Sequence, residues 1–241
     1  MRSLADMTVP NLPILSGSTG AAPVKKERGA LLPARVKPAV ITVTSLGVLI
    51  TIVQILNSLW SPAYTLTREF GLQSRSLHGL IGVLTAPLLH GSWAHLLSNI
   101  VPLLIFGFLI MLGSVRQFVA VTVLVWLVAG MGVWLVGPAH TVTVGASGVV
   151  FGWLAYLVMR GVFTRNVGQI AIGVVLLVLW GGVFWTGIVK VAVADIAGVV
   201  TISWQGHLFG AVGGVLAAFL VGKADGPRRR KQAVPALGSG V

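Results

Sequence analysis

Uncharged apolar runs of about 20 residues recur along this chain from Pro38 to Gly222. A helix needs a run of about that length to cross a hydrocarbon core roughly 30 Å thick. Lipid offers no hydrogen bonds to the backbone, so segments of this kind satisfy their own backbone groups as helices. Only 9% of the 241 residues are charged, against about a quarter in a soluble domain. The sequence therefore predicts an all-α polytopic membrane protein whose surroundings are a lipid bilayer.

The uncharged runs predict six membrane spans. They cover Pro38–Trp60, Leu88–Val115, Gln117–Val136, Val144–Met159, Val167–Val189 and Val199–Gly222. The flanking sequences are polar and rich in Pro, Gly, Ser and basic residues. We therefore expect three parts: a disordered N-terminal tail (1–37), a six-helix membrane domain (38–222) and a basic C-terminal tail (223–241).

Basic residues are distributed unevenly between the two sides of this six-span map. Arg68, Arg75 and Lys190 fall on one side, and the other 14 of the 17 Lys and Arg residues lie on the side of both tails. Cytoplasmic connections of membrane proteins are enriched in Lys and Arg. We therefore expect a multi-pass protein of a bacterial cell membrane with both termini in the cytoplasm. The same distribution accounts for the net charge of +12 by topology, so we expect no nucleic-acid partner.

Two residue types are missing where particular chemistries would need them. The chain has no cysteine, which excludes disulfides, a thiolate metal site and a cysteine nucleophile. The five acidic residues fall in tails or loops on this map, which excludes an aspartyl intramembrane protease and a carboxylate proton relay. They are Asp6, Glu27, Glu69, Asp195 and Asp225. The HExxH motif of metalloproteases is also absent.

Three polar clusters stand near the starts of the second, fourth and sixth spans. These three spans run in the same direction, so residues early in each lie at comparable depth near the outer surface. We expect four of the polar side chains to meet there in one shallow pocket: His95, Asn99, Ser147 and His207. We expect this pocket to open to the outside, where water is available.

Glycines recur every fourth residue on two of the predicted spans. They are Gly148 and Gly152 on the fourth span, and Gly206, Gly210 and Gly214 on the sixth. Faces of small residues let helix backbones approach closely. We expect this contact to bring Ser147 within hydrogen-bonding range of His207.

Each polar residue also has an ordinary structural explanation when taken alone. A serine in a membrane helix usually bonds back to the preceding turn. His90 lies five residues before His95, so we expect it to point elsewhere on the helix and to serve a structural role. A metal site built from His90, His95 and His207 is a competing hypothesis, but it has neither a carboxylate nor a thiolate ligand. We therefore expect no metal and no cofactor.

Together, these motifs resemble those of the rhomboid intramembrane serine proteases. The matching motifs are His90-x4-His95-x3-Asn99, Gly145-Ala146-Ser147-Gly148, and His207 followed by Gly210. The resemblance covers about residues 38–222 and implies a six-transmembrane-helix rhomboid-like bundle. Six residues would have structural roles near the site: His90, Gly145, Gly148, Phe151, Gly206 and Gly210. At Phe151 many members of the family have a tyrosine.

The resemblance implies a serine endopeptidase that uses a dyad. Ser147 is the implied nucleophile and His207 the implied general base. The implied oxyanion donors are the Asn99 side chain, the His95 ring and the backbone N–H of Ser147. The implied substrates are transmembrane segments of other membrane proteins, cut near their outer ends after they enter sideways from lipid, with the fifth span and the outer loops as gates.

Two other function classes remain as alternatives. One is a non-catalytic rhomboid-like protein that binds membrane clients, although members of that kind commonly lack the serine or the histidine. The other is a small transporter or channel, which the gathering of polar residues at one end and the lack of internal repeats disfavour.

Overall fold

The computed structural model describes residues 31–59, 65–196 and 203–233. Within these residues six helical segments are long and apolar enough to cross a membrane. They are Ala34–Leu59, Trp93–Met111, Val115–Val136, Ser147–Thr164, Val167–Ala194 and Trp204–Asp225. The prediction of an all-α, multi-pass bundle is confirmed.

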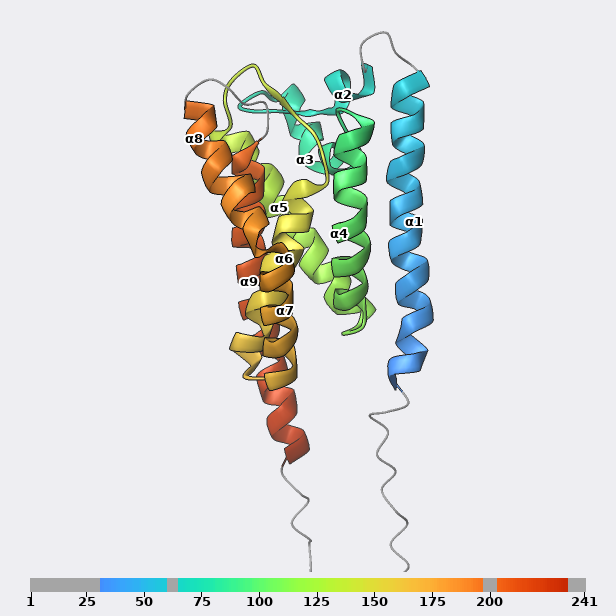
Figure 1. Ribbon diagram of the computed structural model, residues 1–241, viewed down its shortest axis with the longest axis vertical. Helices are drawn as coiled ribbons and strands as arrows, with labels where there is room; N and C mark the ends of the chain where they lie inside the picture. The colour runs from blue at the N-terminus through green and yellow to red at the C-terminus, as the bar shows by residue number, and fades with distance from the viewer. Residues whose placement is uncertain (1–30, 60–64, 197–202, 234–241) are drawn as a thin grey trace, which may run out of the picture.

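The long helices are α1, α4, α5, α6, α7 and α9 (Figure 1). Their bounds are Leu31–Leu59, Trp93–Met111, Val115–Val136, Ser147–Thr164, Val167–Phe184 and Trp204–Ala233. A π-helical segment, η4 (Trp185–Lys190), and a short helix, α8 (Val191–Ile196), continue α7. Short elements gather at one end of the bundle, which we call the site end (upper in Figure 1): α2 (Thr65–Phe70), η2 (His78–Leu80), α3 (Ile81–Thr85) and η3 (Ala86–Leu88).

The helix ends differ from the predicted span ends because hydropathy and helicity end at different places. Helix α1 begins at Leu31 and contains Pro38, so residues 31–37 are helical where a disordered tail was expected. The Arg35 guanidinium donates hydrogen bonds to the carbonyls of Leu112 and Gly113 beyond the end of α4, which holds this basic turn in place. Helix α9 continues past Gly222 into the basic segment. The predicted tails over residues 1–30 and 234–241 lie outside the described residues.

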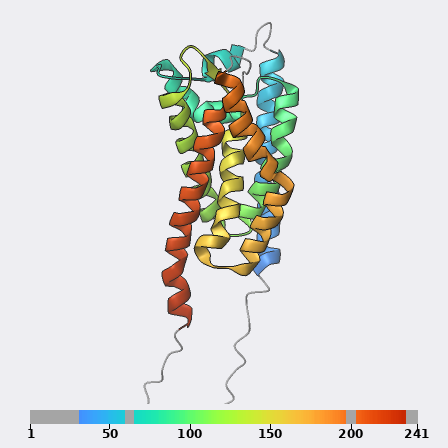
Figure 2. The same cartoon turned by 60° about the vertical axis from the view of Figure 1, so that its left-hand side comes forward.

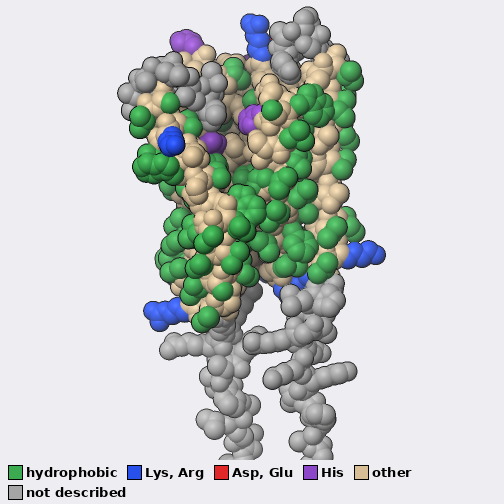
Figure 3. Space-filling view, viewed as in Figure 1, with side chains coloured by type: hydrophobic (Ala, Val, Ile, Leu, Met, Phe, Trp, Pro, Cys, Tyr) green, Lys and Arg blue, Asp and Glu red, His purple; other side chains and the backbone are tan. Residues whose placement is uncertain are grey.

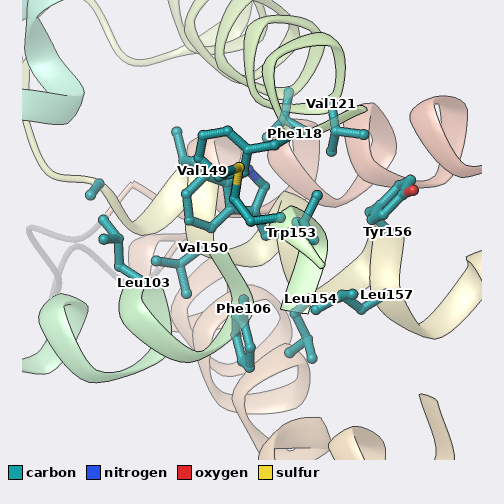
Figure 4. Packing of buried hydrophobic residues seen from close by; sticks show 14 of the residues in the cluster. Leu103, Phe106, Phe118, Val121, Val149, Val150, Trp153, Leu154, Tyr156 and Leu157 are labelled. Carbon is teal, nitrogen blue, oxygen red and sulfur yellow. The ribbon is translucent and has the colours of Figure 1, made fainter. Parts of the chain in front are cut away.

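Helix α6 occupies the centre of the bundle, with α9 and α7 on either side of it in Figure 2. It is the most buried of the six spans, and the segment that contains α7 is the least buried. Trp153 and Tyr156 of α6 have no exposed surface and belong to the same buried apolar cluster as Phe106 and Phe118. The ring of Trp153 contacts that of Phe118, with centroids 5.4 Å apart (Figure 4). Lipid removes most of the hydrophobic driving force between helices, so tight packing of this kind holds the bundle together.

The contact between α6 and α9 is made through backbone atoms. A Cβ atom added at Gly210 would lie 2.1 Å from the carbonyl oxygen of Gly148. One added at Gly214 would lie 2.0 Å from the carbonyl oxygen of Gly152. The expectation that glycine faces allow a close approach is therefore confirmed, and this contact sets the spacing of the helices that carry Ser147 and His207.

A two-stranded antiparallel ladder ties the loops together at the site end. Strands β1 (Leu72–Gln73) and β2 (Val142–Thr143) pair, with Leu72 opposite Thr143. The indole N–H of Trp126 on α5 donates a hydrogen bond to the carbonyl of Val83 in α3, which fixes α3 to the bundle. Since β2 leads directly into the turn before α6, the ladder helps to place the first residue of that helix.

Candidate active site

Ser147 is the first residue of α6 and follows a sharp turn. Gly145 has φ of +118°, a conformation that strongly favours glycine, and its N–H donates to the carbonyl of Ala86 at 2.9 Å. A Cβ atom at Gly145 would also lie 2.5 Å from Cε1 of His95. The turn therefore brings the backbone before Ser147 against the His95 ring.

His207 lies in the first turn of α9 and faces Ser147. Its Nε2 is 2.9 Å from Oγ of Ser147, a hydrogen-bonding distance. Its Nδ1 is 2.7 Å from the carbonyl oxygen of Gly187 in η4. The side chain is almost wholly buried, with 7% of the residue exposed, so the protein holds the ring in one orientation.

Phe151, one turn after Ser147, packs flat on the imidazole of His207. The ring centroids are 4.1 Å apart and the planes differ by 3°. Phe184, the last residue of α7, is in edge-to-face contact with Phe151, with a centroid separation of 5.7 Å. This stack supports the face of the imidazole and needs no hydroxyl on the Phe151 ring.

His95 and Asn99 lie on one face of α4, as their spacing predicts. Ser92 caps the helix by accepting a hydrogen bond from the N–H of His95 at 3.1 Å. The Asn99 amide donates to the carbonyl of His95 at 2.9 Å. An asparagine amide carries two N–H groups, so this bond leaves one for a ligand.

The four side chains line one cavity of about 1080 Å³ at the site end of the bundle. They are His95, Asn99, Ser147 and His207, so their predicted convergence is confirmed. Figure 3 shows histidine side chains at a hollow near this end. The lining also includes Leu97 and Val101, two strongly exposed residues of α4, so the cavity extends to the apolar outer surface of the bundle. No acidic residue is among the described residues that line it.

His90 differs from the sequence-based expectation. It was expected to point away from His95, but the rings are in edge-to-face contact with centroids 5.1 Å apart. The reason is that α4 begins only at Trp93, so His90 lies in a loop to which helical spacing does not apply. Its Nε2 accepts a hydrogen bond from the N–H of Ala146 at 3.4 Å, directly before Ser147. Burial, with a smaller contribution from nearby His95, lowers the pKa of His90 to about 4.

The metal hypothesis gains no support from this geometry. In the part of the chain that the structure describes, no three His, Asp or Glu side chains are grouped so that they could hold a metal ion. His90 directs one ring nitrogen at a backbone N–H, and His207 directs its ring nitrogens at Ser147 and Gly187.

Sequence reasoning missed two neighbours of the site. Gly187, in the π-helical segment, contacts His207. The sequence offered one signal for this residue, a glycine within an apolar span. Asn57 of α1 donates to the carbonyl of His90 at 3.4 Å and to Thr67 Oγ1 at 2.8 Å. A polar residue within the first span was the available signal.

Comparison with known proteins identifies the family of this chain. The family model described as "Rhomboid domain" matches residues 77–224. The chain belongs to the rhomboid family.

Similar proteins occur in mycobacteria. The chain is 42% identical over 174 residues to an uncharacterized protein of Mycobacterium tuberculosis and to one of Mycobacterium bovis, covering 70% of this chain and 69% of each relative. It is 41% identical over 165 residues to an uncharacterized protein of Mycobacterium leprae, covering 66% of this chain and 62% of that protein.

Proposed function

We propose that this protein is an intramembrane serine endopeptidase that cleaves transmembrane segments of other membrane proteins near one end. The observation that carries the proposal is the 2.9 Å contact between Oγ of Ser147 and Nε2 of His207 in a cavity of a rhomboid-family bundle. A serine hydroxyl is a weak nucleophile unless a base accepts its proton, and this contact supplies the base. The dyad uses no carboxylate, in keeping with the lack of acidic residues among the described residues that line the cavity.

In the first step Oγ of Ser147 attacks the scissile carbonyl carbon while its proton passes to Nε2 of His207. The tetrahedral intermediate then collapses, the peptide C–N bond breaks, and the proton passes from His207 to the leaving amine. Water attacks the resulting acyl-enzyme, with His207 again accepting a proton. The second tetrahedral intermediate collapses, the bond between the acyl carbon and Oγ of Ser147 breaks, and His207 returns its proton to Oγ, so the carboxylate product leaves and the serine hydroxyl is restored.

The negative oxygen of the tetrahedral intermediate needs donors that are already in place. The backbone N–H of Ser147 has no partner within its own helix, because it belongs to the first residue of α6. Asn99 and His95 line the same cavity from α4. We assign these three groups to oxyanion stabilisation.

The substrate class follows from the shape of the cavity. It joins a polar site to the exposed apolar face of α4, so a transmembrane helix can reach it sideways from lipid. A helix hides its scissile amides in its own hydrogen bonds, so substrates with small or helix-breaking residues at that depth unwind most easily. We place the protein in a bacterial cell membrane with both termini in the cytoplasm, because basic residues are concentrated on that side.

The test uses purified wild-type protein in mild detergent with a labelled transmembrane substrate that has small residues near its outer end. The matched variants are Ser147→Ala and His207→Ala. We expect a new fragment from the wild type and none from either variant. A fluorophosphonate probe, which reacts with activated serines, should label the wild type at Ser147 and neither variant.

Two outcomes would contradict the proposal. Cleavage by Ser147→Ala at the wild-type rate would exclude this serine as the nucleophile. Neither cleavage nor probe labelling in folded wild-type protein would favour a non-catalytic rhomboid-family protein that binds membrane clients.

A further inference from the structure

Helix α7 changes its winding beside the candidate active site. Its regular part ends at Phe184, and the π-helical segment η4 covers Trp185–Lys190. π-Helical turns are rare and are frequently found at functional sites. In η4 the residue nearest the dyad is Gly187, whose carbonyl oxygen lies 2.7 Å from Nδ1 of His207.

Glycine at this position permits the close approach. A Cβ atom at residue 187 would lie 2.4 Å from Cζ of Phe151 and 3.2 Å from Nδ1 of His207. A side chain would therefore push η4 away from the stacked rings. At Gly182, five residues earlier on α7, an added Cβ would meet nothing within 4 Å.

The contact determines which nitrogen of the imidazole carries the proton. A carbonyl oxygen can only accept a hydrogen bond, so Nδ1 must be the donor. In the neutral ring Nε2 is then unprotonated, and it faces the Ser147 hydroxyl at 2.9 Å. This is the tautomer that a general base needs, and in serine proteases with a triad a carboxylate selects it.

We propose that the backbone carbonyl of Gly187, presented by the π-helical segment η4, is the group that orients His207 and selects its reactive tautomer. Gly187 is thus a positioning residue, and the proposal rests on the proposed function of the dyad. The orientation of the His207 ring then depends on the position of η4, which packs against α9. Segment η4 belongs to the least buried of the six spans.

The first test measures the tautomer directly in the wild type. Protein labelled with ¹⁵N at its five histidines is studied by NMR at a pH where His207 is neutral, and the His207 signals are assigned by their loss in His207→Gln. We expect His207 to be protonated at Nδ1, with a through-bond signal typical of a hydrogen bond. A His207 protonated at Nε2 in folded protein would overturn the proposal without any activity measurement.

The second test compares Gly187→Ala with the matched control Gly182→Ala. We expect Gly187→Ala to give a mixture of His207 tautomers and to lower kcat and the rate of fluorophosphonate labelling about tenfold to a hundredfold, the usual range for losing a hydrogen bond to a group that becomes charged. KM should change little, because Gly187 holds the base and not the substrate. Gly182→Ala should match the wild type in all three measurements.

The outcomes separate this inference from the proposed function. Wild-type tautomer and wild-type kcat in Gly187→Ala would overturn the inference and leave the serine protease proposal intact. A wild type that neither cleaves nor labels, yet shows Nδ1-protonated His207, would leave the orientation in place and overturn the protease. If Gly187→Ala fails to fold, the wild-type NMR measurement alone decides.

Discussion

The ring of Phe151 lies parallel to the imidazole of His207, with the centroids 4.1 Å apart and 3° between the planes. Phe151 belongs to α6, the helix that begins with Ser147, and His207 belongs to α9. The stack therefore connects the two helices of the dyad. It restricts tilting of the ring and leaves the in-plane hydrogen bonds of both ring nitrogens, to Gly187 and Ser147, in place. A tyrosine hydroxyl is not needed for this support.

Replacing Phe151 with alanine should lower kcat about two- to tenfold, the equivalent of one lost aromatic contact. The reason is that the imidazole of His207 gains freedom to tilt away from Ser147. Initial cleavage rates per folded molecule measure the effect. Phe163→Ala is the matched control, since Phe163 is also on α6 and packs against another ring, that of Phe219. Equal rates in the two variants would contradict a role for the stack.

Asn99→Ala should retain weak activity while Ser147→Ala has none. Loss of one oxyanion donor typically lowers kcat by about 10²–10³, whereas loss of the nucleophile removes the acyl-enzyme pathway. Single-turnover cleavage in detergent measures both. Asn166→Ala is the control: Asn166 caps α7 at the opposite end, so its loss should affect stability and not kcat. A wild-type rate for Asn99→Ala would remove Asn99 from the oxyanion site.

Gly214→Ala should destabilise the bundle by about 1–3 kcal/mol, as overpacking of a tight core does. The added methyl would lie 2.0 Å from the carbonyl oxygen of Gly152, so α6 and α9 must separate. Thermal unfolding in detergent measures the loss. Gly181→Ala is the control, because its methyl would meet only Leu177 of its own helix, at 3.7 Å. A Gly214→Ala melting temperature equal to that of the control would show that the contact is looser than described.

Asp225→Asn should lower the stability of the end of the bundle opposite the site by about 1 kcal/mol. Asp225 accepts a hydrogen bond from Arg160 at 2.9 Å, and the Arg160 side chain is only 11% exposed. A charged guanidinium without its partner is costly where water has little access. A double-mutant cycle with Arg160→Gln isolates the pair, and the double variant should lose less than the sum of the single losses. Strict additivity would mean that the pair contributes nothing.

Stability should fall on acidification from about pH 6.5 toward pH 4 because of His90. Its pKa is lowered to about 4 in the folded protein, mainly by burial and further by nearby His95. Between these pH values the unfolded chain binds a proton at this histidine that the folded chain does not, so stability is fully present above about pH 6.5 and declines below it. His90→Gln keeps an acceptor for the Ala146 N–H but does not titrate, so its melting temperature should vary less over this range. An equal pH slope in both proteins would remove His90 as a cause.

The sequence by itself determined the number of membrane spans, their order and the end at which the polar clusters gather. The physical reason is that lipid leaves an apolar segment of about 20 residues no alternative to a helix, and six such helices alternate in direction. Residues at the starts of the second, fourth and sixth spans then share one end. The meeting of His95, Asn99, Ser147 and His207 followed from that alternation and from the glycine faces.

Only the tertiary structure decided how the site is oriented in detail. His90 contacts His95 because His90 lies in the loop before α4, whose N-cap is Ser92, and helical spacing does not apply to loops. Gly187 meets His207, 20 residues further along the chain, because the π-helical segment η4 packs against α9. Contacts between helices depend on their rotation and axial position, which side-chain packing sets. Hydropathy places a helix in the membrane but leaves both of these quantities open.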